Sequence, residues 1–271
     1  MRMKPTVITD RERAEQLLRS DQLSHLMSLK MLTVYPHACR TTVVERDDRW
    51  ACLTELDASM SHWDNRAYPQ ADVIAMPDGN DSELIRHAVE MAEGSHIVYK
   101  VHDDWSRRHF ANRTDYWFVR GFHSYTWHGP VPYEGQYADA EVGRMHRPND
   151  KALEYFAENG YTADELAEHA ERGGVFFGLT HAERLASVCG VYPNHGRVWE
   201  IAGVYTHPRY RRRGFGRRVV WAALQFCAEH GFQPRYQFHH ENTGSRALAE
   251  SLGLIHVLTV DHYAPRPVQS A

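Results

Sequence analysis

The stretch 198–231 constrains this chain most, because it predicts a strand, a basic loop and a helix in immediate succession. The run Val198–Thr206 is rich in apolar and β-branched residues, and a His-Pro pair ends it. Apolar residues then recur at helical spacing over Phe215–His230, and Gly231 stands where a C-terminal cap is expected. This order predicts an α/β fold.

The loop between the strand and the helix combines positive charge with glycine. The first amides of a helix have no internal partner and carry the positive end of the helix dipole. Gly214 and Gly216 remove side chains where a phosphate would press against the backbone. The loop therefore predicts a phosphate or pyrophosphate cradle, and its candidate cofactor-binding residues are Arg211, Arg212, Arg213, Gly214, Phe215, Gly216, Arg217 and Arg218.

Other interpretations of a glycine pair are an ordinary turn, a phosphate-loop NTPase and a dinucleotide loop. The NTPase pattern needs Gly-Lys-Ser/Thr at the helix start, and this chain has Gly216-Arg217-Arg218. The dinucleotide fingerprint needs three spaced glycines early in a βαβ unit, and only two are present. A nucleic-acid patch is disfavoured, because no aromatic platform with a second basic stripe accompanies the arginines.

With Arg211-x-x-Gly214-x-Gly216 directly after a strand, the sequence resembles the GNAT superfamily of acyl-CoA-dependent N-acyltransferases. In that family, R/Q-x-x-G-x-G/A holds the coenzyme A pyrophosphate. Residues 241–254 resemble its second signature, an Asn that opens a helix ending in Leu-Gly-Phe. Upstream, Val175–Thr180 and Leu185–Tyr192 predict the hairpin that the family places before the cradle strand. The resemblance implies a GNAT acetyltransferase domain over residues 137–271, with a mixed central sheet, flanking helices and acetyl-CoA as cofactor.

The resemblance also implies further cofactor contacts. The backbone of Val204, Tyr205 and Thr206 should offer strand-edge hydrogen bonds to the pantetheine amides. Asn242 and Ser245 should contact the pantetheine arm or the phosphates. As bare residues, these two are equally an N-cap and a polar first turn of a helix.

Acetyl transfer to an amine requires that the amine lose a proton, that the oxyanion be stabilised and that the thiolate be protonated. The resemblance to histone-type members makes Glu200 the candidate base, and a salt-bridged strand glutamate is the alternative. No cysteine or serine is positioned as a nucleophile, so we expect direct transfer in a ternary complex.

The general acid is the weak point of the resemblance. The family often has a tyrosine after the leucine of its Asn-led helix, and here Ala249 follows Leu248. His239 and His240 are candidate substitutes because a histidine titrates near neutrality, and surface or core histidines are the alternative. The missing tyrosine leaves open a non-catalytic acyl-CoA-binding regulatory protein.

The first half predicts the same order of elements as the second, with a helix over residues 10–32, a hairpin over 39–56, and a strand over 71–76 before a helix that starts near Asp81. We interpret residues 1–130 as a second, degenerate GNAT-like α/β domain, and an unrelated α/β cap is the alternative. Its junction loop, Asp78–Asp81, is acidic and would repel a pyrophosphate, so we expect no coenzyme A there. Two prolines and two glycines make His128–Gly135 the candidate linker.

The remaining expectations come from composition. Lys+Arg 31 against Asp+Glu 35 gives a net charge of −4, which disfavours a general polyanion binder and mildly favours a cationic amine acceptor, either a small molecule or a peptide. No apolar run approaches membrane-spanning length and the N-terminus lacks an apolar core, so we expect a cytoplasmic protein with reduced cysteines. The histidines show no ligand-spaced pair, which predicts no metal site, and homodimerisation stays open.

Overall fold

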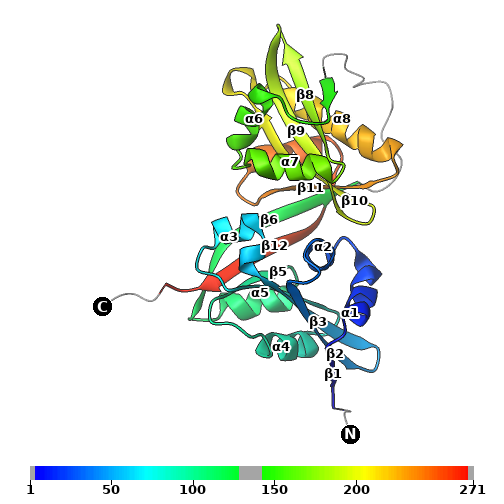
Figure 1. Cartoon of the computed structure of the whole chain (residues 1–271), viewed down its shortest axis with the longest axis vertical. Helices are drawn as coiled ribbons and strands as arrows, with labels where there is room; N and C mark the ends of the chain where they lie inside the picture. Colours follow the sequence, from blue (N-terminus) through cyan, green and yellow to red (C-terminus); the bar gives the residue numbers. More distant parts are fainter. Residues whose placement is uncertain (1–3, 128–141, 268–271) are drawn as a thin grey trace. The chain divides into compact units, whose positions relative to one another are not determined.

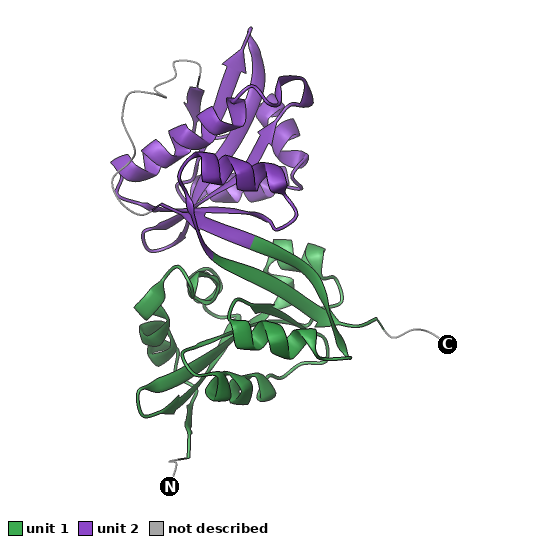
Figure 2. Cartoon of the chain, turned by 180° about the vertical axis from the view of Figure 1, so that it is seen from behind, with its two compact units in different colours: residues 1–122, 258–271 green, residues 123–257 purple. Residues whose placement is uncertain are grey.

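The computed structural model describes residues 4–127 and 142–267 (Figure 1). The chain divides into unit 1, Met1–Phe122 with Leu258–Ala271, and unit 2, His123–Val257 (Figure 2). The predicted linker His128–Gly135 lies outside the described residues. Within the described ranges, none of the helices is long and apolar enough to cross a membrane.

The elements of the first half follow the predicted order, with a short strand (Thr6–Ile8) and a short helix (His62–Ala67) that the sequence did not predict. They are β1 (Thr6–Ile8), α1 (Arg11–Leu18), η1 (Arg19–Asp21), α2 (Leu26–Val34), β2 (Cys39–Arg46), β3 (Arg49–Asp57), η2 (Ala58–Met60), α3 (His62–Ala67), β4 (Val73–Gly79), α4 (Ser82–Glu90), β5 (Ile97–Val101), α5 (Asp104–Ala111) and β6 (Tyr116–Thr126).

Within the described residues, the second half repeats that order without a counterpart of α3. Its elements are β7 (Val142–Met145), α6 (Asp150–Ala157), α7 (Ala163–Glu171), β8 (Val175–His181), β9 (Arg184–His195), β10 (Val198–Thr206), η3 (Pro208–Tyr210), α8 (Phe215–Glu229), β11 (Gln233–His239), α9 (Thr243–Ser251) and β12 (Ile255–Pro265).

The sheet of each unit is completed by a strand from the other half of the sequence. In unit 1 the strand order is β1-β2-β3-β4-β5-β12, and β12 pairs antiparallel with β5 through Asp261–Tyr263. In unit 2 the order is β7-β8-β9-β10-β11-β6, and the Thr126 hydroxyl of β6 donates to the Pro234 carbonyl of β11 at 2.6 Å. In both units the fourth and fifth strands are parallel and the preceding strands are antiparallel. The predicted mixed α/β fold is therefore confirmed, and it occurs once in each unit.

The faces of the unit 2 sheet alternate along each strand, as a pleated strand requires. Phe177 on β8 packs in the cluster that includes α8, whereas its neighbour Phe176 packs in the cluster that includes α6 and α7. The sheet is therefore covered on both faces, with α8 on one and α6–α7 on the other.

Two predicted elements of the first half differ from the structure. The predicted helix 10–32 is divided into α1 and α2, because the Asp21 carboxylate accepts hydrogen bonds from the amide and hydroxyl of Ser24 and competes with helical pairing. The strand predicted to end at Met76 continues to Gly79, so Asp78 belongs to β4 and is buried rather than lying in an acidic surface loop. The cysteines are free thiols, as predicted.

Candidate active site in unit 2

The candidate site lies where β10 and β11 separate. Their parallel register runs from Val198–Gln233 to Ile201–Tyr236, whereas β10 itself continues to Thr206. A register shift against β9 falls between Ala202 and Tyr205, and Gly203 has φ +63 there. This bulge turns the end of β10 away from the regular ladder.

Gly203 is required at the bulge for a steric reason as well as a conformational one. A Cβ at this position would lie 2.8 Å from two ring carbons of Phe156 on α6. The glycine thus lets α6 approach the bulged backbone closely.

The three predicted strand-edge residues follow the bulge directly. The Val204 carbonyl accepts from Asn159 Nδ2 at 3.3 Å, and the Tyr205 carbonyl accepts from the Ser187 hydroxyl at 2.9 Å. The Thr206 carbonyl accepts from Arg211 Nε at 3.1 Å. Side chains therefore already bind the carbonyls of this segment, so a pantetheine arm would have to pair with amides or displace those side chains.

The N-terminus of α8 differs from most helix starts in the described chain. Side chains of Asp, Asn, Ser or Thr accept from first-turn amides in α1, α3, α4, α5, α6, α7 and α9. Helix α8 instead starts from Gly214 in the left-handed conformation, φ +79, with no side-chain cap. A Cβ at Gly216 would lie 3.1 Å from the Thr206 hydroxyl, so this glycine brings the helix start up to the end of β10.

The predicted arginines surround this helix start in different ways. Arg211, Arg212 and Arg213 are exposed, and Arg213 Nη2 lies 3.2 Å from His181 Nε2. Arg217 and Arg218 are half-buried in the first turn, and the Arg218 guanidinium lies 5.4 Å from the Phe215 ring centroid. The loop therefore exposes Arg211, Arg212, Arg213 and Gly214 to solvent. The Phe215 side chain is itself buried in the core, so only its backbone can contribute to an anion site.

The start of α9 is capped from within the chain. Asn242 Oδ1 accepts from the Ser245 amide at 2.9 Å, which is the N-cap role that the residue types also allowed. Leu248 of the same helix lies 3.9 Å from the Cβ that Gly216 would carry, so α9 borders the start of α8. Ala249, at the position of the missing tyrosine, is fully buried.

Glu200 forms a buried ion pair on the sheet face covered by α6 and α7. Its side chain pairs with Arg235 of β11, Nη1 to Oε2 at 2.9 Å, and the two residues are 8% and 2% exposed. Asn194 Nδ2 also donates to Oε2, at 2.6 Å, while the Tyr192 hydroxyl donates to Oε1 at a longer 3.4 Å. The glutamate is thus held on one oxygen by two strong partners and on the other by a weaker one.

The polar cluster around Glu200 extends to the α6–α7 segment. The Tyr161 and Tyr192 hydroxyls lie 3.0 Å apart, and the His169 ring of α7 stacks on Tyr192 at 3.9 Å between centroids. Burial, followed by the effects of Tyr161 and of the Glu200 charge, raises the pKa of Tyr192 well above its ordinary value. Tyr192 therefore stays a neutral phenol that donates toward the glutamate.

Two buried polar atoms of this cluster have no hydrogen-bond partner among the described residues. Within the part of the chain that the structure describes, no hydrogen-bond partner reaches Arg235 Nη2 or Asn194 Oδ1. A buried donor and a buried acceptor without partners cost free energy unless a water or ligand satisfies them. Both flank the carboxylate that the resemblance makes the candidate base.

The two candidate acids lie at the other end of β11. His239 Nδ1 accepts from the Glu241 amide at 3.4 Å, and the His239 and His240 rings lie 4.9 Å apart. Both side chains are accessible, at 39% and 28% exposure. His239 is the last residue of β11 and His240 follows it, next to the start of α9.

Sequence reasoning missed Arg235 and Asn194. Arg235 lies in a strand that also carries Gln233, Gln237 and His239, so its residue type gave no local signal of burial. Only the register of β10 with β11 shows that its partner is Glu200.

Comparisons with known proteins found one family model that matches the second half of the chain and several solved structures with a similar fold. Residues 140–254 match the model of the acetyltransferase (GNAT) family. No curated protein matches. Among solved structures, a GCN5-related N-acetyltransferase from Sphaerobacter thermophilus is 11% identical with TM-score 0.60, covering 98% of both chains.

Two further structures share the fold over most of their length. A GCN5-related N-acetyltransferase from Kribbella flavida is 14% identical with TM-score 0.56, covering 89% of this chain and 95% of its own. A tandem GNAT protein from the clavulanic acid biosynthesis pathway is 14% identical with TM-score 0.55, covering 99% and 100%. The likeness to a tandem protein over the full length accords with the repeated order of elements in the two units.

Proposed function

Because residues 140–254 match the model of the acetyltransferase (GNAT) family, we propose that the chain moves an acetyl group from acetyl-CoA to an amine. The observation that carries the cofactor proposal is the start of α8, where a left-handed Gly214 stands in place of a capping side chain among exposed arginines. Amides at such a helix start favour a phosphate.

In this proposal the pyrophosphate takes the place that a capping Asn or Thr side chain has in the other helices of unit 2. The backbone of Gly214, Phe215 and Gly216 would face the phosphates, and Arg211–Arg213 would neutralise their charge. The end of β10, Val204–Thr206, would run beside the pantetheine arm. Asn242 and Ser245, at the start of α9, border the same opening.

Unit 1 supports the assignment by contrast. At the equivalent junction, Asp81 accepts from the amides of Glu83 and Leu84 and caps α4 with its own carboxylate. A negative charge already fills the helix start where a phosphate would bind. We therefore propose one coenzyme site, in unit 2.

The proposed reaction is direct attack of the amine on the thioester. Cys189 and Cys227 are buried, and burial raises the pKa of the Cys227 thiol to about 12, so neither supplies a thiolate nucleophile. Glu200 is the proposed base. Its Oε1 would accept the proton, because Oε2 is held by Arg235 and Asn194.

His239 and His240 are the proposed sources of the proton for the departing thiolate. Both are accessible, lie at the separated end of β11 and have ring nitrogens that can donate a proton. When bound, acetyl-CoA supplies the activated thioester; the chain's part is to position the amine, accept its proton and protonate the sulfur.

A non-catalytic acyl-CoA-binding protein is the second candidate. The buried Ala249 favours it, since no tyrosine stands at the family's acid position. Thiol release on mixing the full chain with acetyl-CoA and a panel of amines distinguishes the two. Amine-dependent release supports the enzyme, and tight coenzyme binding without release on any amine supports the binder.

A further inference from the structure

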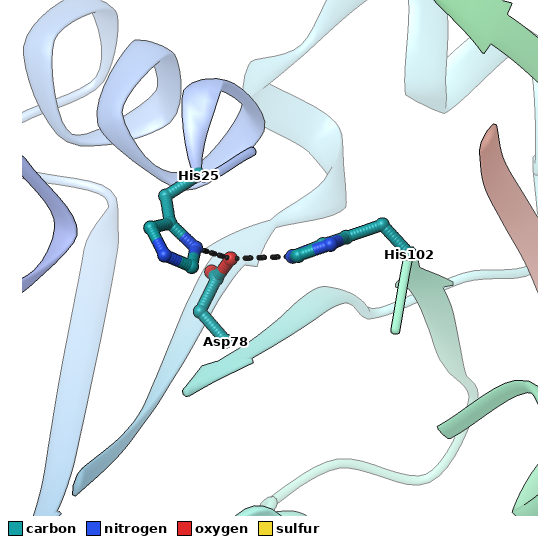
Figure 3. Close-up of side chains that lie close together, drawn as sticks. All are labelled: His25, Asp78 and His102. Carbon is teal, nitrogen blue, oxygen red and sulfur yellow. Dashed lines mark hydrogen bonds and ion pairs between the residues drawn. The ribbon is translucent and has the colours of Figure 1, made fainter. Parts of the chain in front are cut away.

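We propose that His25, Asp78 and His102 of unit 1 form a binding site for a divalent transition-metal ion, with zinc as the best-matched metal. Their ligand atoms all lie within 4.8 Å of one another. His25 Nδ1 and His102 Nε2 both point at the same oxygen, Asp78 Oδ1, at 2.7 and 2.9 Å (Figure 3). This site is independent of the acyl-transfer proposal.

The fold brings the three residues together from distant positions. His25 is the residue that precedes α2, Asp78 is near the end of β4, and His102 directly follows β5. The parallel register pairs Val73 with Ile97, an offset of 24, and Asp78 and His102 are separated by the same 24 positions. The pairing of β4 and β5 therefore sets two of the ligands side by side.

The surroundings match a built site rather than a surface cluster. Asp78 is 3% exposed, His25 is buried, and the His102 side chain, 17% exposed, forms the accessible side. The Ser28 hydroxyl donates to the second carboxylate oxygen, Oδ2, and so leaves Oδ1 for an ion. Outer hydrogen bonds of this kind orient metal ligands.

The donor set selects the class of metal. Two imidazoles and one carboxylate suit Zn²⁺ and its neighbours, whereas Mg²⁺ and Ca²⁺ prefer oxygen ligands alone. Zinc bonds of about 2.1 Å at tetrahedral angles separate ligand atoms by roughly 3.4 Å. The nitrogens of His25 and His102, now 2.7 and 2.9 Å from Asp78 Oδ1, therefore need to move away from that oxygen by about 0.7 and 0.5 Å, and a water can fill a fourth position.

The proposed metal site lies in unit 1 at the position that corresponds to the bulge of β10 in unit 2. Asp78 follows Val73 at the spacing at which Gly203 follows Val198, and these two valines open the corresponding parallel registers. Where unit 2 has the glycine bulge that opens its sheet, unit 1 has a carboxylate held by two histidines. The position that carries the bulge glycine in unit 2 therefore carries a ligand of the proposed metal site in unit 1.

The test is zinc titration of the full-length chain, prepared without a histidine tag and stripped with a chelator. Calorimetry should show one tight equivalent of Zn²⁺, and Co²⁺ should give the visible absorption of a tetrahedral nitrogen–oxygen site. His102→Ala should weaken zinc binding by at least about tenfold, as loss of a ligand must. His96→Ala is the matched control, because His96 is an exposed histidine beside Asp72 in the same unit, and it should bind zinc as the parent does.

A second measurement guards against a variant that folds poorly. Zinc should raise the thermal unfolding midpoint of the parent chain and of His96→Ala, and should leave that of His102→Ala unchanged. The proposal is overturned if the parent binds no stoichiometric zinc and gives no tetrahedral cobalt spectrum. It is equally overturned if folded His102→Ala binds zinc with parental affinity, since the three residues then form only a hydrogen-bonded cluster.

Discussion

A negative charge placed at the start of α8 gives the sharpest perturbation of the proposed cradle. Gly214 has φ +79, and a Cβ built there meets none of the described atoms within 4 Å. Asp and Asn both tolerate the left-handed conformation better than other residues, with a cost of about 1 kcal/mol. Gly214→Asp and Gly214→Asn should therefore fold alike and differ by one charge.

The size of the effect follows from that charge. At about 5 Å from a phosphate in a partly exposed loop, the added carboxylate repels each phosphate charge by ~1–2 kcal/mol. The arginines at 211–213 offset part of this repulsion. A net loss of about 2 kcal/mol corresponds to a roughly 30-fold weaker Kd for coenzyme A.

Calorimetric titration of coenzyme A into both variants measures this difference. Gly214→Asp should bind about 30-fold more weakly than Gly214→Asn at low salt, and the gap should narrow as salt screens the exposed loop. Equal affinities of the two variants would refute the placement of phosphate at this helix start.

Three further predictions concern the bulge, the buried ion pair and the proposed acid. Gly203→Ala should lower the free energy of unfolding by about 3 kcal/mol, because it adds both backbone strain and overpacking. Gly160→Ala, where φ is +81 and the space around the Cβ is open, should lower it clearly less. Similar losses for the two variants in denaturant unfolding would contradict the packing at the bulge. Glu200→Gln and Arg235→Met should each lower the free energy of unfolding by about 3 kcal/mol. The double variant should lose less than the sum of the two single losses, and additive losses would argue against the ion pair. His240→Ala should lower kcat and leave the Kd for coenzyme A unchanged, and an unaltered kcat removes His240 from the proposed mechanism.

Local signals predicted the elements around the candidate site. Spacing of apolar residues gave the β8–β9 hairpin and α8, and Gly231, with φ +65, follows α8 where a C-terminal cap was expected. These features depend on neighbours in sequence, so periodicity and glycine position suffice to predict them. The order of elements within each half was also predictable, because the same elements recur in both halves.

Long-range pairing lay beyond the sequence. Arg235 meets Glu200 only through the register of β10 with β11, and the two residues are 35 positions apart. Asp78 looked like part of an acidic loop because nothing local showed that β4 continues to bury it against His25. The sequence also did not predict that β12 lies beside β5 or that β6 lies beside β11, because alternation predicts a strand and not its partner.

Amide hydrogen exchange of the full chain with and without coenzyme A tests most directly whether the start of α8 is the cofactor site. Coenzyme A should protect amides 214–218 and 204–206 from exchange and should leave the start of α4, at residues 82–84, unchanged. Protection at the α4 start, or none at 214–218 under saturating coenzyme A, would contradict it.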